Sequence, residues 1–510
     1  MDLGHLVRVG ELDPARRDRP AVSVGPDTAT HHALAMAARR VSTGLRELGA
    51  RSGDRVGILM KNSVDYWTSY LAITSMGAIA VRLNFRLTVD EIRYALIDSG
   101  CAIVLADAEL APRARAAAGD VKLVVRGTSA TVSGPTVPWS LLSDADPAEP
   151  PVQRAADEAA MIMYTSGTTG RPKGAVWTHG GTMAFALMQA ARWGFGAETV
   201  SLVTGPMYHV GALEDLCLPA VLMGGHAVAL ESGGFTVDRA VERVVSVGAT
   251  DVLMFPFMIY ELLARPDALT GLEGVGRLFT GGEPLQGWAV EELRRRVPQL
   301  ELWQIYGLTE GTPIVTAAAP DELALNPRAV GRPLPMAEVS LRDADGVPQT
   351  TGPGEIWTRS PARASGYWRK PKESADTFVD GWCRTGDLGA FDEHGLLEVV
   401  GRVKDMIRSG GENIYPAELE DVLAGHEAVR EIAVIGVPDA QYTEAVCAVV
   451  VLEPGRDLSL GELQAFSRDR LASYKTPKHL RVVEELPRTA SGKVQKFRLR
   501  EMALAKGAAR

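Results

Sequence analysis

Two patterns of hydrophobic residues alternate along the first part of the chain: one has the spacing of an α-helix, and the other is the short continuous run of a buried strand. Apolar residues recur at helical spacing over residues 28–48, 62–76 and 88–98. Short continuous apolar runs, typical of buried strands, cover residues 56–60, 78–83 and 101–106. Thr88 followed by Glu91 matches a capping box, so we expect a helix to begin there. Strands that alternate with helices predict parallel pairing, so the expected fold class is a doubly wound α/β sheet.

The alternation continues to about residue 310 and then gives way to a different pattern. Further strands are expected at residues 201–203, 227–230, 251–255, 278–280 and 302–306, the last of them ending at Gly307. From residue 335 to about residue 402, short strands between turns predict a small β-rich subdomain. Downstream, helices are expected at residues 416–423 and 460–471, and strands at residues 431–437 and 445–452. We therefore expect an N-terminal domain over residues 1–402 and a small α+β C-terminal domain over residues 403–510.

Composition and charge exclude several classes of protein. With 46% hydrophobic and 23% charged residues the chain has the balance of a soluble globular protein, and a net charge of −9 argues against nucleic acid as a partner. The most apolar stretch, residues 70–81, is too short to span a bilayer, and residues 1–20 lack the apolar core of a signal peptide. No CxxC spacing occurs among the cysteines, Cys101, Cys217, Cys383 and Cys447. We therefore expect a cytoplasmic protein with reduced thiols, of a size compatible with a homodimer.

A loop rich in glycine and hydroxyl residues follows the apolar run at residues 161–164. It consists of Thr165, Ser166, Gly167, Thr168, Thr169 and Gly170, and Lys173 follows three residues later. Backbone N–H groups and hydroxyls converge readily in such a loop, and with one cation they suit a polyphosphate. The spacing differs from that of a Walker A loop. A flexible linker has the same composition, but the apolar run that leads into the loop favours the phosphate site.

The stretch YTSGTTGRPKG at residues 164–174 resembles the signature loop of the adenylate-forming superfamily. This superfamily includes acyl-CoA synthetases, aryl-CoA ligases, peptide adenylation domains and firefly luciferase. Similar motifs follow in the family's order at residues 306–310, 381–387, 401–411 and 487–493. The resemblance therefore covers almost the whole chain. It implies a large N-terminal domain of α/β subdomains, a small mobile C-terminal domain, and ATP-dependent activation of a carboxylic acid.

This activation replaces the poor oxide leaving group of a carboxylate by AMP, which a thiol can then displace. The first step needs neutralisation of the triphosphate and a carboxylate held in line. The resemblance assigns the nucleotide side of the site to residues 165–170 and Lys173, to Gly281, Gly282 and Glu283, and to Tyr306, Gly307, Thr309 and Glu310. Tyr306 would lie against the adenine and Thr309 would contact the α-phosphate. Glu310 would bind Mg²⁺, a hard cation that prefers carboxylate oxygens.

The resemblance places the remaining nucleotide contacts and the catalytic lysine in the C-terminal part of the chain. Asp387 and Arg402 would bind the ribose, and Lys404 falls where the family has its hinge. The following loop would contact AMP and leave room for the pantetheine arm of CoA, through Arg408, Gly410, Gly411, Glu412 and Asn413. Lys493 matches the lysine that bridges the carboxylate and the α-phosphate, where a fixed charge stabilises the transition state.

An apolar segment near residue 210 is expected to line the acyl pocket. It contributes Met207, Tyr208, Ala212, Leu213 and Asp215, and its composition favours an uncharged chain or ring. His209 matches a position that gates the acyl pocket in relatives, so we count it among the catalytic candidates. We do not expect it to act as a general base. The alternative is a histidine that only packs in the core. Glu214 or Asp215 could meet a substrate amino group, but such acids more often face solvent or pair with a basic residue.

Together the motifs predict an AMP-forming acyl-CoA synthetase that uses ATP, Mg²⁺ and coenzyme A, with a fatty acid or another apolar acid as substrate. One alternative is an enzyme that loads an acyl or β-amino-acyl group onto a carrier-protein phosphopantetheine in trans. A luciferase-like monooxygenase has weaker support. An alternative that is not an enzyme is a catalytically inactive nucleotide-binding module. The joint presence of Lys173, Glu310, Asp387 and Lys493 disfavours it, since a binding module does not require all four.

Overall fold

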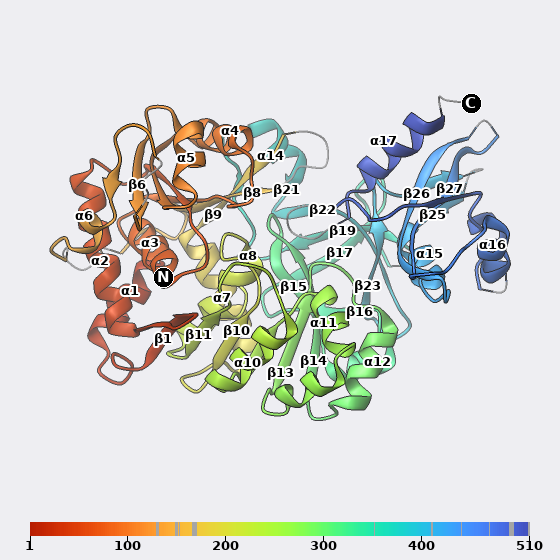
Figure 1. The fold of residues 1–510 in the computed structure, drawn as a ribbon, viewed down its shortest axis with the longest axis horizontal. Helices are drawn as coiled ribbons and strands as arrows, with labels where there is room; N and C mark the ends of the chain where they lie inside the picture. The colour runs from red at the N-terminus through yellow and green to blue at the C-terminus, as the bar shows by residue number, and fades with distance from the viewer. Residues whose placement is uncertain are drawn as a thin grey trace. The chain divides into compact units, whose positions relative to one another are not determined.

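The chain forms two compact units in the computed structural model (Figure 1). The structure describes residues 1–128, 132–147, 151, 153–165, 171–350, 352–409, 412–439, 441–468, 470–488 and 494–507. Unit 1 comprises Met1–Val339 and Thr358–Thr385, and unit 2 comprises Ser340–Trp357 and Gly386–Arg510. The strands and helices of the two units are described separately below.

An eight-stranded sheet forms the first half of unit 1. Its strands, in sheet order, are β20 (Gly366–Tyr367), β9 (Lys173–Thr178), β8 (Ala159–Thr165), β4 (Ile79–Arg82), β3 (Arg55–Leu59), β5 (Cys101–Asp107), β6 (Lys122–Arg126) and β7 (Val137–Pro138). Its helices are α3 (Val64–Ser75), α4 (Val89–Ser99), α5 (Ala111–Ala118) and α6 (Ser140–Ser143). The strands from β8 to β7 pair in parallel, and β9 and β20 add to them antiparallel.

Helices cover both faces of this sheet. Ile103 and Leu105 of β5 belong to a core shared with α2 (His31–Glu47) and α3, whereas Val104 between them belongs to a core shared with α4 and α5. Because successive residues of a strand point to opposite faces, burial on both faces explains the continuous apolar run of this strand. The predicted doubly wound α/β architecture is confirmed.

A second sheet forms the other half of unit 1. Its strands, in sheet order, are β16 (Ala329–Pro333), β15 (Thr312–Ala318), β14 (Glu301–Leu308), β13 (Arg277–Gly281), β12 (Asp251–Leu253), β10 (Val200–Val203), β11 (His226–Ala229), β1 (Pro20–Val24) and β2 (Asp27–Thr30). The remaining elements of unit 1 are α1 (Gly4–Leu12), α7 (His179–Trp193), α8 (Val210–Leu213), α9 (Cys217–Leu222), α10 (Val237–Val247), α11 (Pro256–Leu263), the 3₁₀ helix η1 (Pro266–Leu272), α12 (Gly287–Arg296), α13 (Pro320–Leu325), α14 (Pro371–Thr377) and β21 (Phe378–Val379). Pairing is parallel from β14 to β1, and β2, β15 and β16 are antiparallel to their neighbours.

The ends of two early helices show how local chemistry sets the boundaries. The capping box of Thr88 and Glu91 is present at the start of α4, as predicted. The helix expected from residue 28 begins only at His31, because residues 27–30 form β2 and pair with β1. The hydroxyl of Thr30 then accepts a hydrogen bond from the N–H of Ala33 and caps α2.

Strand β14 extends beyond the end predicted for it. The strand was expected to end at Gly307, but it continues to Leu308 and pairs antiparallel with β15, with a register shift between Tyr306 and Leu308. A Cβ at Gly307 would lie 2.1 Å from the carbonyl oxygen of Thr312. The glycine therefore lets the two strands approach closely at this irregular point, and the tight connection that follows carries Thr309 and Glu310.

Unit 2 contains two further groups of strands. The first comprises, in sheet order, β18 (Pro348–Gln349), β17 (Glu338–Arg342), β19 (Gly354–Arg359), β22 (Trp382–Phe391) and β23 (Leu397–Arg402). The second comprises β25 (Glu412–Ile414), β24 (Ile407–Ser409), β27 (Thr443–Leu452), β26 (Val429–Asp439) and β28 (His479–Val482), which pairs with β27. Its helices are α15 (Pro416–Leu423), α16 (Leu460–Arg468), the 3₁₀ helix η2 (Ser473–Lys475) and α17 (Lys496–Gly507).

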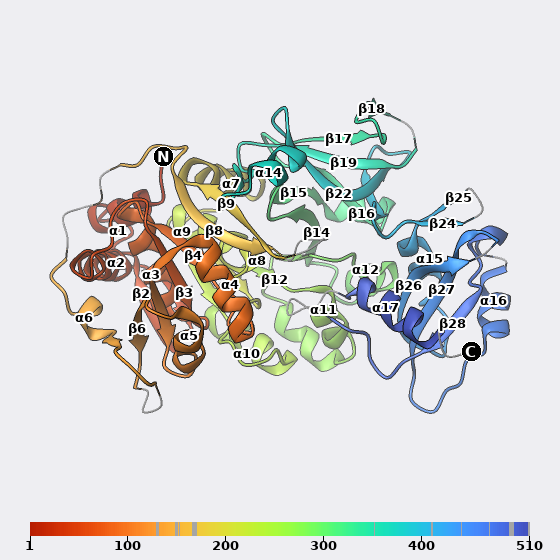
Figure 2. The ribbon, with the colours of Figure 1, turned by 90° about the horizontal axis from the view of Figure 1, so that it is seen from above.

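The second sheet of unit 2 is buried on both faces. Val446, Ala448 and Val450 of β27 pack with α15 and α16, whereas Cys447 and Val449 pack with α17. Figures 1 and 2 show α16 and α17 on opposite sides of this sheet. This arrangement makes the C-terminal part of the chain a two-sided α+β structure, as the sequence pattern indicated.

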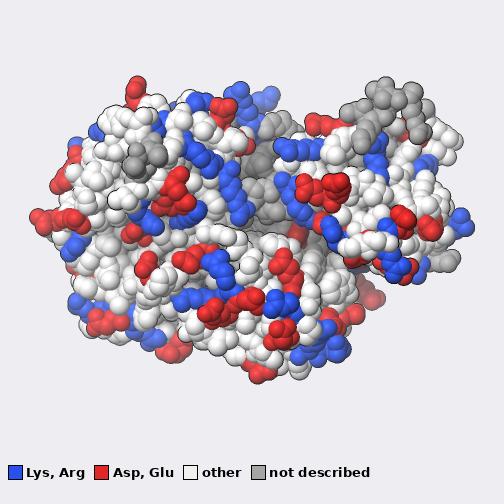
Figure 3. Space-filling model, in the orientation of Figure 1, with Lys and Arg blue, Asp and Glu red and all other residues white. Residues whose placement is uncertain are grey.

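The surface and the cysteines carry few features that suggest special chemistry. Basic and acidic side chains are interspersed over the face shown in Figure 3. Cys101, Cys217, Cys383 and Cys447 are all buried and free. Within the described part of the chain, no helix is long and apolar enough to cross a membrane.

Candidate active site

The ends of the β8–β9 hairpin bracket the predicted phosphate loop. Strand β8 ends at Thr165, β9 begins at Lys173, and the two residues face one another across the hairpin. The predicted loop residues between them lie outside the described residues: Ser166, Gly167, Thr168, Thr169 and Gly170. The ammonium of half-buried Lys173 lies 5.0 Å from the centre of the Tyr367 ring, which is a cation–π distance. A cation is therefore held where the phosphate loop ends.

The carboxylate of Glu310 lies against the same hairpin. Its Oε1 accepts a hydrogen bond of 2.7 Å from the hydroxyl of Thr165 and one of 3.1 Å from the hydroxyl of Tyr367. Burial, and then the charge of Glu310, raise the pKa of Tyr367, so this phenol stays protonated and donates. The backbone is anchored as well, since Trp177 Nε1 donates to the carbonyl of Thr309 at 2.9 Å. Thr309 and Glu310 are thus fixed beside Thr165 and Lys173.

Tyr367 and Trp177 were not predicted as site residues. Tyr367 lies in β20, which pairs with β9, and the pairing brings it to Glu310 across 57 residues of sequence. Trp177 lies on β9 itself and is 1% exposed. Tyr367 follows Gly366 in a short aromatic stretch, and no spacing in the sequence connects this stretch to residue 310.

The glycine turn and the aromatic residue of the predicted adenine site come from neighbouring strands. Strands β13 and β14 are parallel, and Gly281 faces Ile305, the residue before Tyr306. Gly282 follows with φ of 88° and Glu283 is half-buried. The carboxyl ends of parallel strands meet at one edge of a sheet, so these groups lie together there, as expected for a doubly wound fold.

The predicted acyl segment is almost completely buried. Met207, Ala212 and Leu213 are at most 1% exposed, and Tyr208 packs edge-to-face on Phe85 with ring centres 5.4 Å apart. The ring of Phe255, which was not among the individual residues predicted for the site, lies against Gly205 and Gly282. A Cβ at Gly205 would be 3.1 Å from this ring and a Cβ at Gly282 would be 3.6 Å from it. The wall of this region is therefore apolar and aromatic.

A fully buried ion pair lies behind the acyl segment. Arg82 and Glu214 are both 0% exposed, with Nη1 of Arg82 2.5 and 2.6 Å from the two carboxylate oxygens. Arg82 also donates to the carbonyl oxygens of Met207 and His209. Burial raises the pKa of Glu214, while the charge of Arg82 opposes this effect. Glu214 thus pairs with a basic residue, which was the more ordinary of its two expected roles, and Arg82 fixes the acyl segment.

His209 and Asp215 flank the short helix α8. His209 is half-buried and is the N-cap of α8, since its Nδ1 accepts a hydrogen bond of 3.1 Å from the N–H of Gly211. Asp215 is 5% exposed and follows the helix, which ends at Leu213 rather than including both acids. Both residues lie beside the predicted acyl segment.

The predicted ribose contacts meet in unit 2. Asp387 of β22 and Arg402 of β23 face one another across antiparallel strands, and Arg402 Nε donates to the Asp387 carboxylate at 2.7 Å. Asp387 is 8% exposed, while the side chain of Arg402 is 42% exposed. A charged hydrogen bond of this kind orients the carboxylate.

The hinge candidate and the loop after it also lie in unit 2. Lys404 is exposed, and Arg500 of α17 donates to its carbonyl oxygen and to Asp405 at 3.4 Å. The N–H of Arg408 donates to the carboxylate of Glu444 at 2.8 Å, and Glu412 is exposed on β25. Three predicted residues, Gly410, Gly411 and Lys493, and the side chain of Asn413 lie outside the described residues.

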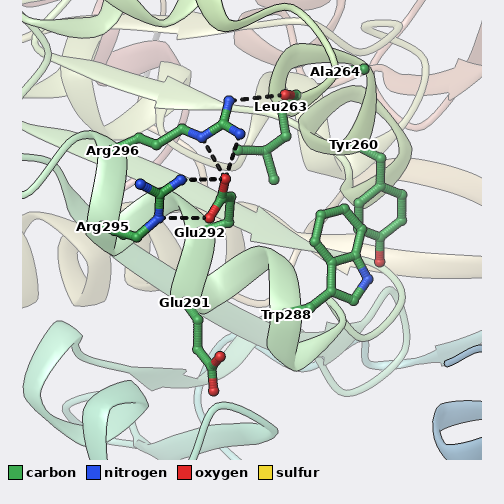
Figure 4. Close-up of a pocket in the computed structure, with 8 residues that line it drawn as sticks. All are labelled: Tyr260, Leu263, Ala264, Trp288, Glu291, Glu292, Arg295 and Arg296. Atoms are coloured by element: carbon green, nitrogen blue, oxygen red, sulfur yellow. Dashed lines mark hydrogen bonds and ion pairs between the residues drawn. The ribbon is translucent and has the colours of Figure 1, made fainter.

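A pocket of about 490 Å³ on unit 1 involves none of the predicted site residues (Figure 4). It lies between α11 and α12, where the rings of Tyr260 and Trp288 stack with centres 5.5 Å apart. The carboxylate of Glu292 bonds to Arg295 and Arg296 within it. These guanidinium groups hold the pKa of Glu292 down at about 2. Glu292, Arg295 and Arg296 are paired with one another, and none of the predicted site residues lines this pocket.

The carboxylate of Glu310 has the donor chemistry of a ligand to a nucleotide-bound magnesium ion. In the described part of the chain, no group of three or more His, Cys, Asp or Glu residues is arranged to hold a metal ion alone. Magnesium bound with a nucleotide needs only one or two carboxylates, because phosphate oxygens and water supply the other ligands. The half-buried carboxylate of Glu310, beside Thr165 and close to Lys173, matches this donor set.

Two family descriptions match most of the chain. The family described as AMP-binding enzyme matches residues 13–368, and the family described as AMP-binding enzyme C-terminal domain matches residues 418–493. The first of these matches alone covers well over half of the chain. The two together include most of the residues identified above.

Several characterised proteins are similar over nearly their whole length. A feruloyl-CoA synthase of an Amycolatopsis species is 36% identical, over 96% of this chain and 97% of the relative. A long-chain-fatty-acid–CoA ligase of Mycobacterium tuberculosis is 34% identical, over 94% of each chain. A fatty acid–[acyl-carrier-protein] ligase of Streptomyces coeruleorubidus is 33% identical, over 94% of this chain and 93% of the relative.

Two solved structures show the same architecture. An anthranilate CoA ligase in complex with anthranoyl-AMP superimposes with a TM-score of 0.91 at 25% identity, over 100% of this chain and 98% of that chain. ATP-bound MatB from Rhodopseudomonas palustris superimposes with a TM-score of 0.89 at 30% identity, over 98% of this chain and 99% of that chain.

Proposed function

The chain belongs to the AMP-binding enzyme family and is an AMP-forming acid–thiol ligase, and from this we propose that it joins a ring-bearing carboxylic acid to coenzyme A, using ATP. The observation that carries the choice of acid is the ring of Phe255, which lies against Gly205 and Gly282. A flat aromatic group stacks favourably in such a place. The feruloyl-CoA synthase and the anthranilate CoA ligase, whose names both refer to aromatic acids, support this choice.

In the first step a carboxylate oxygen attacks the α-phosphorus of ATP and pyrophosphate leaves. We assign the β- and γ-phosphates to residues 165–170 and Lys173, the α-phosphate to Thr309 and the adenine to Tyr306. Gly281, Gly282, Glu283 and Gly307 would line the adenine and acyl sides. The hydrogen bonds that fix Thr309 against Trp177, and Glu310 against Thr165 and Tyr367, support this assignment, because a preorganised site stabilises developing charge at little reorganisation cost.

Glu310 would hold the magnesium ion, whose charge offsets that of the phosphates. Its Oε1 already accepts two hydroxyl donors, and these orient the carboxylate. In that chemistry the hydroxyls of Thr165 and Tyr367 would keep the Glu310 carboxylate correctly placed.

In the second step the thiol sulfur of CoA attacks the acyl carbon, the bond to AMP breaks and the thiol proton is released. Asp387 and Arg402 would hold the ribose, and Lys493 would act on the carboxylate and α-phosphate in the first step. The C-terminal domain, residues 403–510, would turn about Lys404 between the steps. The loop of Arg408, Gly410, Gly411, Glu412 and Asn413 would then line the thiol path. The hydrogen bond by which Arg402 orients the buried carboxylate of Asp387 supports the ribose assignment.

Acid-dependent pyrophosphate release tests the proposal. Ring-bearing acids and saturated acids of 4 to 18 carbons would be compared with and without CoA, with acyl-CoA detected by mass spectrometry. We expect acyl-CoA from the ring-bearing acids with kcat/KM at least about tenfold above the saturated acids. Equal or better turnover of long saturated acids would contradict the proposed substrate class.

A carrier protein is the second candidate for the thiol. The similar acyl-carrier-protein ligase is the observation in its favour. Pyrophosphate release that gives acyl-AMP but no acyl-CoA, followed by acyl transfer to an added phosphopantetheinylated carrier protein, would support this acceptor instead of CoA.

A further inference from the structure

Asn62 is a buried polar side chain that connects the two sheets of unit 1. It is 9% exposed and lies between β3 and α3 of the eight-stranded sheet. Its carboxamide hydrogen-bonds three backbone groups that follow strands of the other sheet, and two of them, in Gly205 and Met207, lie at the start of the predicted acyl segment. Assuming the proposed function, we infer that Asn62 is a positioning residue for the acid, because it holds this segment in place.

The carboxamide of Asn62 lies where two neighbouring strands end. Strands β10 and β11 are parallel and end opposite one another, at Val203 and Ala229. The Nδ2 of Asn62 donates to the carbonyl oxygen of Gly205 at 3.0 Å and to that of Leu230 at 2.8 Å. A carboxamide has two N–H donors, and both are used here. One side chain therefore ties together the segments that follow the two strands.

Met207 is held on both sides of its Cα by side chains of the eight-stranded sheet. Its N–H donates to Asn62 Oδ1 at 2.7 Å, and its carbonyl oxygen accepts from Arg82. Arg82 is the last residue of β4, and Asn62 follows β3, the parallel neighbour of β4. Arg82 also donates to the carbonyl oxygen of His209 at 3.1 Å. The ends of two strands of one sheet thus position a segment that continues from the other.

The position of this segment bears on the acid because Gly205 faces the aromatic wall. A Cβ at Gly205 would be 3.1 Å from the ring of Phe255, so the backbone and the ring are close together. The hydrogen bond from Asn62 to Gly205 therefore fixes the spacing at the ring on which the acid is proposed to stack. A misplacement of roughly 1 Å can cost a factor of about 100 in rate. Asn62 acts through this backbone and is not itself a catalytic residue.

Separate contacts hold the nucleotide side of the site. The carboxylate of Glu310 accepts from Thr165 and Tyr367, and the carbonyl of Thr309 accepts from Trp177. These hydrogen bonds do not involve Asn62. A change at Asn62 should therefore weaken the use of the acid and spare the use of ATP. A side chain that only supported the fold would affect both substrates alike.

The test compares Michaelis constants on the intact enzyme. Initial rates of pyrophosphate release are measured with the acid that the wild type turns over best, varying first the acid and then ATP. In Asn62→Ala the KM for the acid should rise at least about tenfold, while the KM for ATP should stay within about threefold. Asn62→Ser, a smaller change that cannot serve all three backbone groups, should show the same pattern and decides the question if Asn62→Ala does not fold.

A second position tests whether the effect passes through Met207. Arg82→Lys keeps a charge opposite Glu214, but an ammonium lacks the planar fork that also reaches the carbonyl oxygens, so the KM for the acid should rise here too. In Asn62→Ala/Arg82→Lys the rise should be clearly smaller than the product of the two single effects, because both variants release the same residue.

Thr250→Val is the matched control. Thr250 Oγ1 accepts a hydrogen bond of 3.0 Å from the N–H of Val200, at the opposite end of β10. The variant loses a hydrogen bond from a side chain to the same strand, and it should leave both KM values unchanged.

Two results would overturn the positioning role of Asn62: an unchanged KM for the acid in a folded variant, or equal rises in KM for the acid and for ATP. Every variant is compared with the wild type on one and the same acid. A wild-type preference for saturated acids would therefore contradict the proposed substrate class without deciding the role of Asn62.

Discussion

Glu310 is the residue at which three distant segments of unit 1 meet. Its Oε1 accepts hydrogen bonds from Thr165 and Tyr367, so a change at Glu310 affects both the proposed ion site and its supports. We expect Glu310→Gln, which keeps the shape and removes the charge, to lower the rate of pyrophosphate release about 100-fold. Part of the loss should be recovered at high magnesium concentration. The measurement is the initial rate over a magnesium titration.

A milder change at the same place serves as the control. Tyr367→Phe removes one hydroxyl donor and leaves the ring over which Lys173 lies. We expect the apparent affinity for magnesium to fall about tenfold, in line with the loss of a hydrogen bond to a charged group, with kcat little changed. If Tyr367→Phe proved as damaging as Glu310→Gln, the phenol would have a direct role in the reaction, and the carboxylate would not be the ion ligand assigned here.

The buried ion pair of Arg82 and Glu214 allows a quantitative prediction about the free energy of unfolding. Arg82→Met or Glu214→Leu alone leaves an unpaired buried charge and should cost about 3–5 kcal/mol in the free energy of unfolding. The double variant Arg82→Met/Glu214→Leu removes both charges and should recover most of this loss. Urea denaturation of the four proteins gives the coupling energy. Losses that simply add in the double variant would show that the two side chains do not depend on each other.

Residues in the site differ in how readily the sequence reveals them. Thr309 and Glu310 lie in a short contiguous motif next to a strand, so the resemblance of that motif to the family was enough to propose them. Arg82 and Tyr367 have no such signal, because their roles come from contacts across 132 and 57 residues of sequence. A buried arginine at the end of an apolar strand is unusual, and that exception to the hydrophobic pattern was the only available hint.

At the scale of elements, the irregular pairing of β14 and β15 leaves no room for a side chain at Gly307. A Cβ at Gly307 would lie 2.1 Å from the carbonyl oxygen of Thr312 and 2.4 Å from that of Pro313. We expect Gly307→Ala to destabilise the protein by about 1–3 kcal/mol and to reduce activity at least tenfold, because the strands must separate and move Thr309 and Glu310. Thermal denaturation and pyrophosphate release measure the two effects.

Gly274 provides the comparison for that experiment. A Cβ at this position would meet no atom within 4 Å. Gly274→Ala should therefore change stability by no more than about 0.5 kcal/mol. If Gly307→Ala behaved like Gly274→Ala, the close approach of β14 and β15 would not matter for the site.

The elements themselves were largely predictable from their periodicity and caps. The capping box at Thr88 and the helix α15 have the expected bounds, since each is defined by neighbouring residues. The early start assigned to α2 and the early end assigned to β14 were wrong for one reason. In both places a strand partner, β1 or β15, extends the pairing, and a partner distant in sequence leaves no mark on local propensity.

At the scale of the whole molecule, the buried His31 and the half-buried His226 link stability to pH. His31 begins α2 and His226 begins β11, with His31 Nε2 3.2 Å from the carbonyl of Gly225 and His226 Nε2 2.8 Å from Ser23 Oγ. Burial lowers the pKa of each to about 4. Between about pH 6.5 and pH 4 the unfolded chain therefore binds more protons than the folded chain, and stability falls as pH falls through this window. His31 alone should contribute on the order of 1–3 kcal/mol.

Melting temperatures at pH 7 and pH 5 test this linkage. The wild type should lose several degrees over this interval, and His31→Gln should lose less, because its side chain does not titrate. His394→Gln, at an exposed site of unit 2, is the control and should follow the wild type. If the melting temperature fell equally in the wild type and in His31→Gln between pH 7 and pH 5, another group would be responsible for the loss of stability at low pH.

The buried cysteines have a practical consequence for chemists who wish to modify this protein. Burial raises the pKa of Cys101 to about 12 and also raises the pKa of Cys217 and of Cys447, and only a thiolate reacts rapidly with maleimides. Native folded protein should therefore take up almost no label. A thiol engineered at a surface position would then be labelled alone, so fluorescent dyes can be attached to each unit without first removing the natural cysteines.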